Sequence, residues 1–378
     1  MTMGLNKVTY PVFKKDQPDD TFKFQPLPQP SGMYPFHLNL HSLLHPVSSN
    51  KMIFHMVGDT GSVKQSQFQR LVAGEMIKQY SDAAVEDRPQ FLFHLGDVVY
   101  SFGEAENYYS QFFAPYSNYP APVFAIAGNH DADVNPARQP YKSLDAFMKV
   151  FCDEEARPVI FSKDAARKSL IQPNVYWTLE TPLANMLGLY GNVPKYGMIT
   201  KEQKDWFYEE LKTAQRQRPE KAIIVCVHHA PYSADSNHAS SPVMIEFLEE
   251  AFKQTGVLPD IVFSGHVHNY QRFSRHYSEG SVVPFVVAGA GGYDDLHPLV
   301  IEGSKDFFAD PSIAAAVHLE QYCDNKHGFL KIAIEKTNQG LMLTGEYFSI
   351  PHVDHFGEEI TSFLTDRFQI SCGQRMKH

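Results

Sequence analysis

Five short polar segments in this sequence of 378 residues combine side chains that bind hard metal ions. The segments are GDTG at 58–61, GDVVY at 96–100, GNHD at 128–131, HHAPYS at 228–233 and GHVHNY at 265–270. Their carboxylate, phenol, amide and imidazole donors are Asp59, Asp97, Tyr100, Asn129, His130, Asp131, His228, His229, His266 and His268. A donor set of this kind, without a thiolate, favours zinc, iron or manganese. Seven or eight ligands exceed what one ion needs, so the set indicates two ions about 3.5–4 Å apart that share a bridging carboxylate.

Each polar segment follows an apolar run with the length and composition of a β-strand. The runs are MIFHMV, FLFHL, PVFAIA, AIIVCV and DIVFS, in that order. Helical spacing appears between several of them, at 67–80, 142–152, 201–215 and 242–255. Strands that alternate with helices favour an α/β architecture, in which ligands bind beyond the carboxyl ends of the strands. We therefore expect all five polar segments to lie at that edge.

The remaining chain is divided by its composition. Residues 1–50 are rich in proline and aromatic residues, and we expect an ordered extension over the main domain, with a disordered tail as the alternative. The main domain, 51–350, also contains the strand-like runs PFVVAGA, FLKIAIE and LMLTGEYFSI and a hairpin turn at 338–340. Its mixed segment 132–200 is expected to supply one helix, two strands (NVYWTLE and ANMLGLYGN) and loops over the active face. Residues 351–378 form an expected C-terminal tail.

Composition and charge argue against several classes of protein. With 43% apolar and 20% charged residues the chain can bury a sizeable core, and its net charge of −10 argues against nucleic acid as a main partner. No apolar run approaches the roughly 20 residues that span a bilayer, so we expect no membrane partner. The N-terminal MTMGLNKVTY lacks the apolar core of a signal peptide, which slightly favours the cytoplasm. Four widely spaced cysteines, Cys152, Cys226, Cys323 and Cys372, fit thiols in a reducing compartment, with two disulfides as the alternative.

The order GDTG, GDVVY, GNHD, VCVH, GHVH resembles the calcineurin-like metallophosphoesterase superfamily and, within it, the purple acid phosphatases. The resemblance covers about residues 51–295 and implies a sandwich of two mixed sheets flanked by helices, in α/β/β/α layers, with 51–350 as the catalytic domain. Gly61 stands where most of the superfamily has a histidine, and Tyr100 stands where it has a second aspartate. The paired change implies that Tyr100 binds metal, because Fe³⁺ lowers the pKa of a phenol by coordination. Core packing or a hydrogen bond to a ligand is the alternative for Tyr100.

The resemblance also implies a role for each residue of the clusters. Fe³⁺ would be held by Asp59, Asp97, Tyr100 and His268, and a divalent ion (Zn²⁺, Mn²⁺ or Fe²⁺) by Asp97, Asn129, His228 and His266, with Asp97 bridging both. His229 is the alternative to His228, because each fits part of the family spacing. His130 would contact the phosphoryl group of a phosphate ester and His238 would lie near its leaving oxygen, with a surface position as the alternative for His238. Asp131 would orient ligands, and His94, His276 and His297 are expected to be structural or surface residues.

Together these expectations describe an enzyme. It would hydrolyse phosphate monoesters, as an acid phosphatase, by in-line attack of a metal-bound hydroxide. Protonation of the leaving oxygen by His238 or His130 would contribute roughly 10²–10⁴-fold. A metal-dependent phosphodiesterase or triesterase with two divalent ions is the main alternative, and a scaffold without catalysis is a minor one. The sequence contains neither GxSxG nor a P-loop, which argues against a serine hydrolase and against nucleotide-driven phosphoryl transfer.

Overall fold

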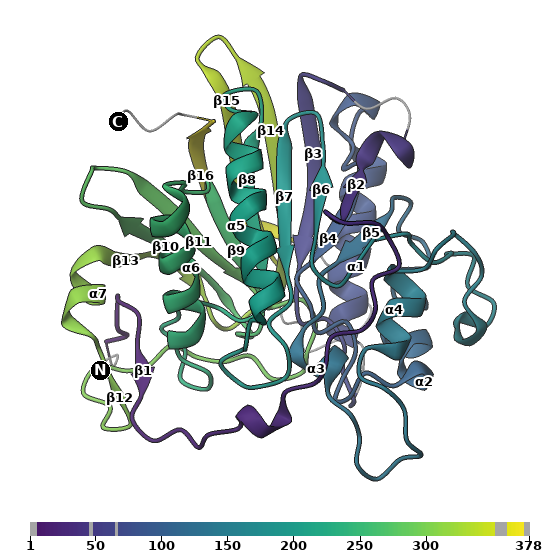
Figure 1. Cartoon of the computed structure of the whole chain (residues 1–378), viewed down its shortest axis with the longest axis horizontal. Helices are drawn as coiled ribbons and strands as arrows, with labels where there is room; N and C mark the ends of the chain where they lie inside the picture. The colour runs from purple at the N-terminus through teal and green to yellow at the C-terminus, as the bar shows by residue number, and fades with distance from the viewer. Residues whose placement is uncertain (1–5, 45–47, 65–66, 352–360, 374–378) are drawn as a thin grey trace.

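The computed structural model describes residues 6–44, 48–64, 67–351 and 361–373. Two mixed β-sheets pack face to face, with helices on their outer faces (Figure 1). The eight-stranded sheet has the order β13 (Val317–Cys323), β10 (Tyr270–His276), β11 (Val282–Ala288), β9 (Ile261–Ser264), β8 (Ala222–Val227), β7 (Ala184–Leu189), β6 (Trp177–Glu180) and β2 (His37–Asn39). The six-stranded sheet has the order β16 (Phe363–Cys372), β15 (Gly340–Ser349), β14 (Gly328–Thr337), β3 (Lys51–Val57), β4 (Leu92–His94) and β5 (Val123–Ala125). A small separate sheet pairs β1 (Phe13–Lys14) with β12 (Phe307–Phe308).

The α-helices are α1 (Gln67–Asp82), α2 (Ala105–Tyr108), α3 (Asn129–Ala132), α4 (Asp145–Phe151), α5 (Lys201–Arg216), α6 (Pro242–Thr255) and α7 (Pro311–Ala316). Helices α5 and α6 cover the eight-stranded sheet, and α1 lies against the six-stranded sheet (Figure 1). Helices α5 and α6 both begin at side-chain caps. Thr200 accepts the N–H of Gln203 in α5, and Ser241 accepts that of Met244 in α6. Each cap stabilises its helix by about 1 kcal/mol. Helix α6 ends at Gly256, whose φ of 66° is a left-handed conformation that glycine adopts without steric cost.

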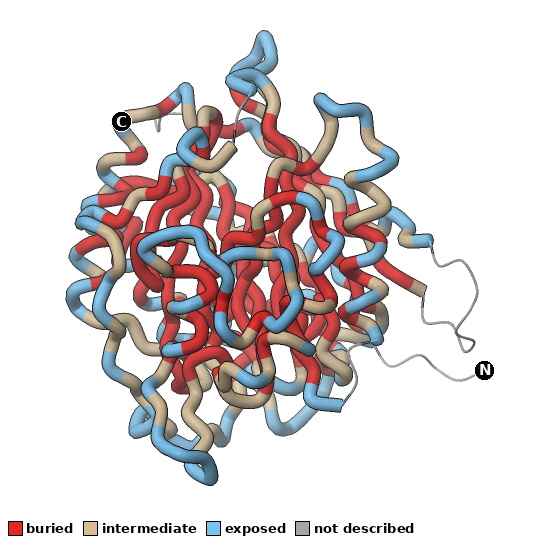
Figure 2. Tube along the Cα trace, turned by 90° about the vertical axis from the view of Figure 1, so that its right-hand side faces the viewer, coloured by how far each residue is buried: buried red, intermediate tan, exposed pale blue. Residues whose placement is uncertain are grey.

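Aromatic side chains fill the space between the two sheets. Phe93 of β4 meets Trp177 of β6 with ring centroids 6.1 Å apart, and Tyr270 of β10 stacks on Tyr347 of β15 at 3.9 Å. Figure 2 shows that the buried residues follow the strands, whereas exposed residues gather in peripheral loops. Burial of such rings stabilises the sandwich by roughly 25 cal/mol per Å² of apolar surface. The α/β/β/α arrangement of two mixed sheets and flanking helices confirms the expected fold class.

The parallel strands determine where the polar segments lie. Strands β3, β4 and β5 are parallel neighbours in one sheet, and β8 and β9 are parallel neighbours in the other. The carboxyl ends of parallel neighbours share an edge, so the segments that follow these five strands meet at one end of each sheet. A hydrogen bond of 2.8 Å between Nδ1 of His228 and the carbonyl of Leu95 joins these two edges. The sandwich thus brings all five polar segments together.

Two strands come from the segments that the sequence analysis set apart. Strand β2, within the expected extension 1–50, pairs with β6, and β16, within the expected tail 351–378, pairs with β15. Residues 1–5, 45–47, 352–360 and 374–378 of those two segments lie outside the described residues. The two strands predicted within 132–200 are β6 and β7, and the turn predicted at 338–340 joins β14 to β15. All four cysteines are free and buried, and the described residues include no helix of the length and apolarity that crosses a membrane.

Candidate metal centre

Three of the candidate ligands have a backbone conformation that is uncommon for residues other than glycine. Asp59, Asp97 and His266 have φ values of 56°, 53° and 67°. Each stands at a turn just after a strand, so the left-handed conformation reverses the chain there and directs the side chain toward the other sheet. Such strained residues persist where the surrounding structure fixes them, and they cluster at functional sites. The geometry therefore points to a site at these strand ends.

One group of donors consists of Asp59, Tyr100 and His268. The Tyr100 hydroxyl lies 3.2 Å from Oδ1 of Asp59 and 3.2 Å from Nε2 of His268. The same Nε2 lies 3.6 Å from Oδ1 of Asp59. All three side chains are buried, and their polar atoms face one another at distances from which a single cation can contact all three.

A second group consists of Asp97, Asn129, His228 and His266. Nε2 of His228 lies 3.3 Å from Oδ2 of Asp97 and 3.1 Å from Oδ1 of Asn129. Oδ1 of Asn129 also lies 3.0 Å from Nδ1 of His266. The ligand atoms of Asp97, His228 and His266 all lie within 4.8 Å of one another, a spacing compatible with a metal ion. The structure thus brings together all seven residues predicted as metal ligands, in two adjacent groups.

The protonation preferences of these side chains suit a cation. Burial lowers the pKa of His266 and of His268 well below the usual value, so both imidazoles are neutral near pH 7 and offer a lone pair. Burial also lowers the pKa of His228, but Asp97 outweighs burial and raises it to about 9. A positive charge is therefore favoured beside Asp97, and a proton or a metal cation can supply it. Nε2 of His266 is buried without a hydrogen-bond partner, which leaves it free to bind a cation.

The two remaining acidic donors have raised pKa values. Burial raises the pKa of Asp59 well above its usual range. Burial, followed by the charges of Asp97 and Asp59, raises the pKa of the Tyr100 phenol. Two carboxylates and a phenol confined in a buried cluster favour a compensating positive charge. The residues present therefore fit a metal-binding site.

Hydrogen bonds outside the donor groups hold the loops in place. The carboxylate of Asp131 accepts the N–H groups of Val98, Val99 and Gly128, at 3.0, 3.1 and 2.9 Å. This carboxylate therefore ties the loop after β4 to the loop after β5, in agreement with an orienting role. The side chain of Gln111 bonds both the N–H and the C=O of Tyr100, at 2.8 and 2.9 Å.

His228 and His229 occupy different environments. His228 is anchored through Nδ1 to Leu95 and faces Asp97 through Nε2. The His229 ring instead packs against the ring of His266, with centroids 4.6 Å apart. In the part of the chain that the structure describes, neither ring nitrogen of His229 has a hydrogen-bond partner. The geometry therefore favours His228 as the donor.

A pocket of about 260 Å³ opens over the donor groups. Its walls are formed by Asp97, Tyr100, His130, Asn237, His238, His266, His268, Tyr293, Asp295 and His297. Nδ1 of His130 lies 2.7 Å from the carbonyl of Ser101, which places a proton on that nitrogen, and its backbone N–H donates to Asp97. His238 packs beside His266 with ring centroids 4.2 Å apart. Both histidines predicted to serve a substrate therefore line the pocket, and His238 is half-buried in its wall.

Four residues of the pocket wall were not predicted from the sequence as part of the site: Asn237, Tyr293, Asp295 and His297. His297 was set aside as structural or surface, but it lines the pocket and stacks on His268 with ring centroids 4.3 Å apart. The segment after β11 carries three of these residues, and its GAGGYDD sequence has no periodicity that reveals its path. The polar residues directly after the strand-like run PFVVAGA were the sequence signal that could have indicated a sixth segment of the site. His94, by contrast, contacts Thr60 at 2.8 Å beneath the site and is structural, as expected.

Curated relatives match part of the chain in sequence. A 161-residue stretch is 27% identical to "Purple acid phosphatase 23" of Arabidopsis thaliana, covering 42% of this chain and 30% of that protein. A 194-residue stretch is 28% identical to "Purple acid phosphatase 15" of the same plant, covering 49% of this chain and 32% of that protein. The matches therefore span about a third of the length of these relatives.

Comparison with solved structures and family models addresses the whole fold. A structure described as "Structure of PhoD" superposes with a TM-score of 0.51 at 13% identity, over 86% of this chain and 73% of that chain. At this identity the likeness shows the fold alone. The model of the family described as "Calcineurin-like phosphoesterase" matches residues 52–270, which is more than half of the chain and includes all five polar segments. The chain therefore belongs to the calcineurin-like phosphoesterase family and is a hydrolase of the metallophosphoesterase type.

Proposed function

We propose that the protein hydrolyses phosphate monoesters with two metal ions, in the manner of a purple acid phosphatase. Fe³⁺ would be held by Asp59, Asp97, Tyr100 and His268. A divalent ion, Zn²⁺, Mn²⁺ or Fe²⁺, would be held by Asp97, Asn129, His228 and His266, so that Asp97 would belong to both sets.

The position of the Tyr100 hydroxyl carries this proposal. It lies 3.2 Å from both Asp59 and His268. Among the described residues, neither a lysine nor an arginine contacts this hydroxyl. A phenol with a pKa near 10 is a poor ligand for a divalent ion at neutral pH, but Fe³⁺ favours a hard, charged oxygen. The tyrosine therefore supports Fe³⁺ at this half of the site.

The chain's own residues have separate tasks in the reaction. When bound, the cations lower the pKa of a water molecule and neutralise charge on the phosphoryl oxygens. His130, fixed through Nδ1 to the Ser101 carbonyl, turns its other nitrogen to the phosphoryl group in the pocket. His238 lines the pocket beside His266, where it would hold or deliver a proton for the leaving oxygen. Its loop is fixed by the bond of 2.5 Å from its backbone N–H to Asp235.

The dimensions of the pocket support a monoester substrate. Its volume of about 260 Å³ is below the roughly 300–1,000 Å³ of sites that enclose drug-sized ligands. A phosphoryl group with one small ester substituent fits such a space more readily than a diester with two bulky arms. The curated relatives named as purple acid phosphatases support the same reading.

Metal analysis combined with steady-state kinetics tests the proposal. The purified protein is expected to contain about two metal ions per chain and to hydrolyse phenyl phosphate with a kcat/KM at least roughly tenfold above that for diphenyl phosphate. Asp97→Ala should lose both ions and activity, because it removes the shared ligand. A preference for the diester would favour the phosphodiesterase alternative. A folded protein that binds no metal and hydrolyses neither ester would favour a scaffold and overturn the proposal.

A further inference from the structure

The N-terminal segment, whose role the sequence leaves open, reaches the loops around the pocket. Figure 1 shows it passing along the lower side of the sheets from β1 toward α3. The backbone of Val12 donates to the carbonyl of Ser233 at 2.8 Å and accepts from Ser240 at 2.9 Å. Ser233 and Ser240 flank the loop that carries His238. The segment therefore braces one wall of the pocket.

A second loop is held by the same segment. The carboxylate of Asp20 accepts the backbone N–H of Lys195 at 3.0 Å. The Asn192 side chain bonds both the N–H and the C=O of Gln25, at 2.9 and 2.8 Å. The loop 190–197 thus has a fixed position relative to the extension, and so does the side chain of Lys195.

Two lysines meet where these loops approach the pocket. Nζ of Lys195 lies 3.4 Å from the carbonyl of Asn237, a residue of the pocket wall. Lys14, in β1, comes two residues after Val12, whose backbone is bonded to both flanks of the His238 loop. Burial and then the charge of Lys14 lower the pKa of Lys195, whereas Asp235 and Asp20 act in the opposite direction. The charges of both lysines also act on His297 in the pocket wall. Two ammonium groups are therefore brought toward the same side of the pocket, although like charges repel.

The nearby carboxylates are engaged with backbone N–H groups. Asp235 is buried and accepts the backbone N–H groups of Asn237 and His238, at 3.0 and 2.5 Å. Asp20 is engaged with the backbone of Lys195. In the part of the chain that the structure describes, neither Lys14 nor Lys195 forms a side-chain ion pair. An anionic ligand would satisfy both ammonium groups.

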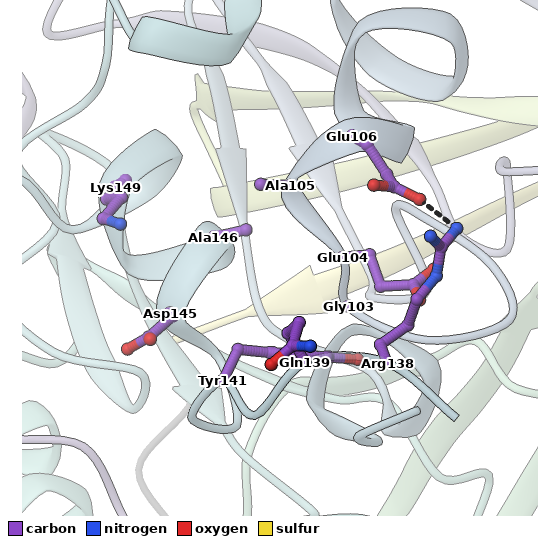
Figure 3. Close-up of a pocket in the computed structure, with 10 residues that line it drawn as sticks. All are labelled: Gly103, Glu104, Ala105, Glu106, Arg138, Gln139, Tyr141, Asp145, Ala146 and Lys149. Atoms are coloured by element: carbon purple, nitrogen blue, oxygen red, sulfur yellow. Dashed lines mark hydrogen bonds and ion pairs between the residues drawn. The ribbon is translucent and has the colours of Figure 1, made fainter. Parts of the chain in front are cut away.

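In a larger pocket elsewhere, the arginine is already paired with carboxylates. This pocket has a volume of about 380 Å³ and lies beside the segment Gly103–Glu106. Figure 3 shows the Arg138 side chain directed at Glu106, with Lys149 on the opposite side of the pocket. Arg138 forms ion pairs with both Glu104 and Glu106, so its charge is already compensated. The pocket also contains no histidine. The lysine pair is therefore the better candidate for binding an anion beside the metal centre.

We propose that Lys14 and Lys195 form an anion subsite that binds a second negatively charged group of the substrate. The preferred substrates are then small phosphate monoesters that carry an additional phosphate or carboxylate. This inference rests on the proposed phosphatase function. It gives the N-terminal extension a direct part in substrate selection, because the extension supplies Lys14 and fixes the loop of Lys195.

Matched pairs of substrates test the subsite. Fructose 1,6-bisphosphate is compared with fructose 6-phosphate for a second phosphate, and 3-phosphoglycerate with glycerol 3-phosphate for a carboxylate. The ratio of the two KM values within a pair is the measurement, because it cancels general effects of a substitution on folding. In Lys14→Met and Lys195→Met the wild-type preference for the more anionic member should fall about 3- to 10-fold. Lys221→Met is the control, since Lys221 is also half-buried but precedes β8, at the opposite end of the sheet.

Each outcome has a defined meaning. A fall of the ratio in only one pair supports the subsite and identifies the second group as phosphate or carboxylate. Unchanged ratios in both lysine variants, or an equal fall in Lys221→Met, would overturn the subsite while leaving the phosphatase proposal intact. If the wild type hydrolyses none of the four esters, the phosphatase proposal fails for these four substrates. Calorimetric binding of pyrophosphate then decides the subsite, which predicts weaker binding in both lysine variants and is overturned by equal binding.

Discussion

Asp97 contacts two histidines of the candidate metal centre, one through each carboxylate oxygen. One oxygen accepts the backbone N–H of His130 at 2.9 Å, and the other lies 3.3 Å from His228. Burial raises the pKa of this carboxyl, but His228 and then His130 outweigh burial and lower it well below the usual range. Asp97 therefore stays ionised, as the proposed role of a carboxylate shared by two cations requires.

The adjacent histidines His228 and His229 allow a matched test at this scale. His228→Ala should reduce bound metal from about two ions per chain toward one and lower kcat by at least roughly 100-fold, because it removes a donor beside Asp97. His229→Ala removes an equally buried imidazole that faces His266 and should retain both ions. Metal content is measured by mass spectrometry after dialysis. The reverse pattern would assign the ligand to His229.

At the scale of elements, the site depends on loops that follow five strands. Asp131, in α3, joins two of these loops by accepting three backbone N–H groups. Asp131→Ala leaves buried donors without acceptors and should lower the free energy of unfolding by about 3 kcal/mol or more. Urea denaturation gives this value. Asp145→Ala, on α4, is the control and should change it by less than about 1 kcal/mol, so equal losses in both variants would contradict the role of Asp131.

The elements also show which parts could be predicted from the sequence. Strands such as β8 and helices such as α6 were predictable, because continuous apolar runs and a 3.6-residue period reflect local burial. The candidate donors directly follow those strands, so their convergence followed from the parallel arrangement. Strands β2 and β16 and the pocket residue His297 were not predictable. Their positions depend on contacts with distant segments, and no local period records such contacts.

At the scale of the whole molecule, the N-terminal extension is bound to both the sheet and a helix. His37 of β2 contacts Glu180 of β6 at 2.9 Å and Glu210 of α5 at 2.7 Å. Burial lowers the pKa of His37, but the two carboxylates outweigh burial and raise it to about 9. A raised pKa means that protonated His37 stabilises the fold fully below about pH 6.5 and loses this contribution as pH rises through about 9.

Substitution of His37 by glutamine tests this pH dependence. His37→Gln should lower the free energy of unfolding by about 2 kcal/mol at pH 6, after allowance for partial solvent exposure, and by much less at pH 10. The difference between wild type and variant cancels the effect of other titrating groups. Urea denaturation at both pH values provides the measurement. An equal difference at pH 6 and pH 10 would show that the ion pairs of His37 contribute nothing specific.

The most direct test of the proposed dimetal centre is the visible absorption spectrum of the purified protein beside that of Tyr100→Phe. A tyrosinate bound to Fe³⁺ absorbs visible light by charge transfer from oxygen to iron. We expect a broad visible band in the wild type and its loss in Tyr100→Phe, with iron still present by metal analysis. A colourless wild type that holds two divalent ions, or a band that survives in Tyr100→Phe, would contradict the assignment of Tyr100 and Fe³⁺.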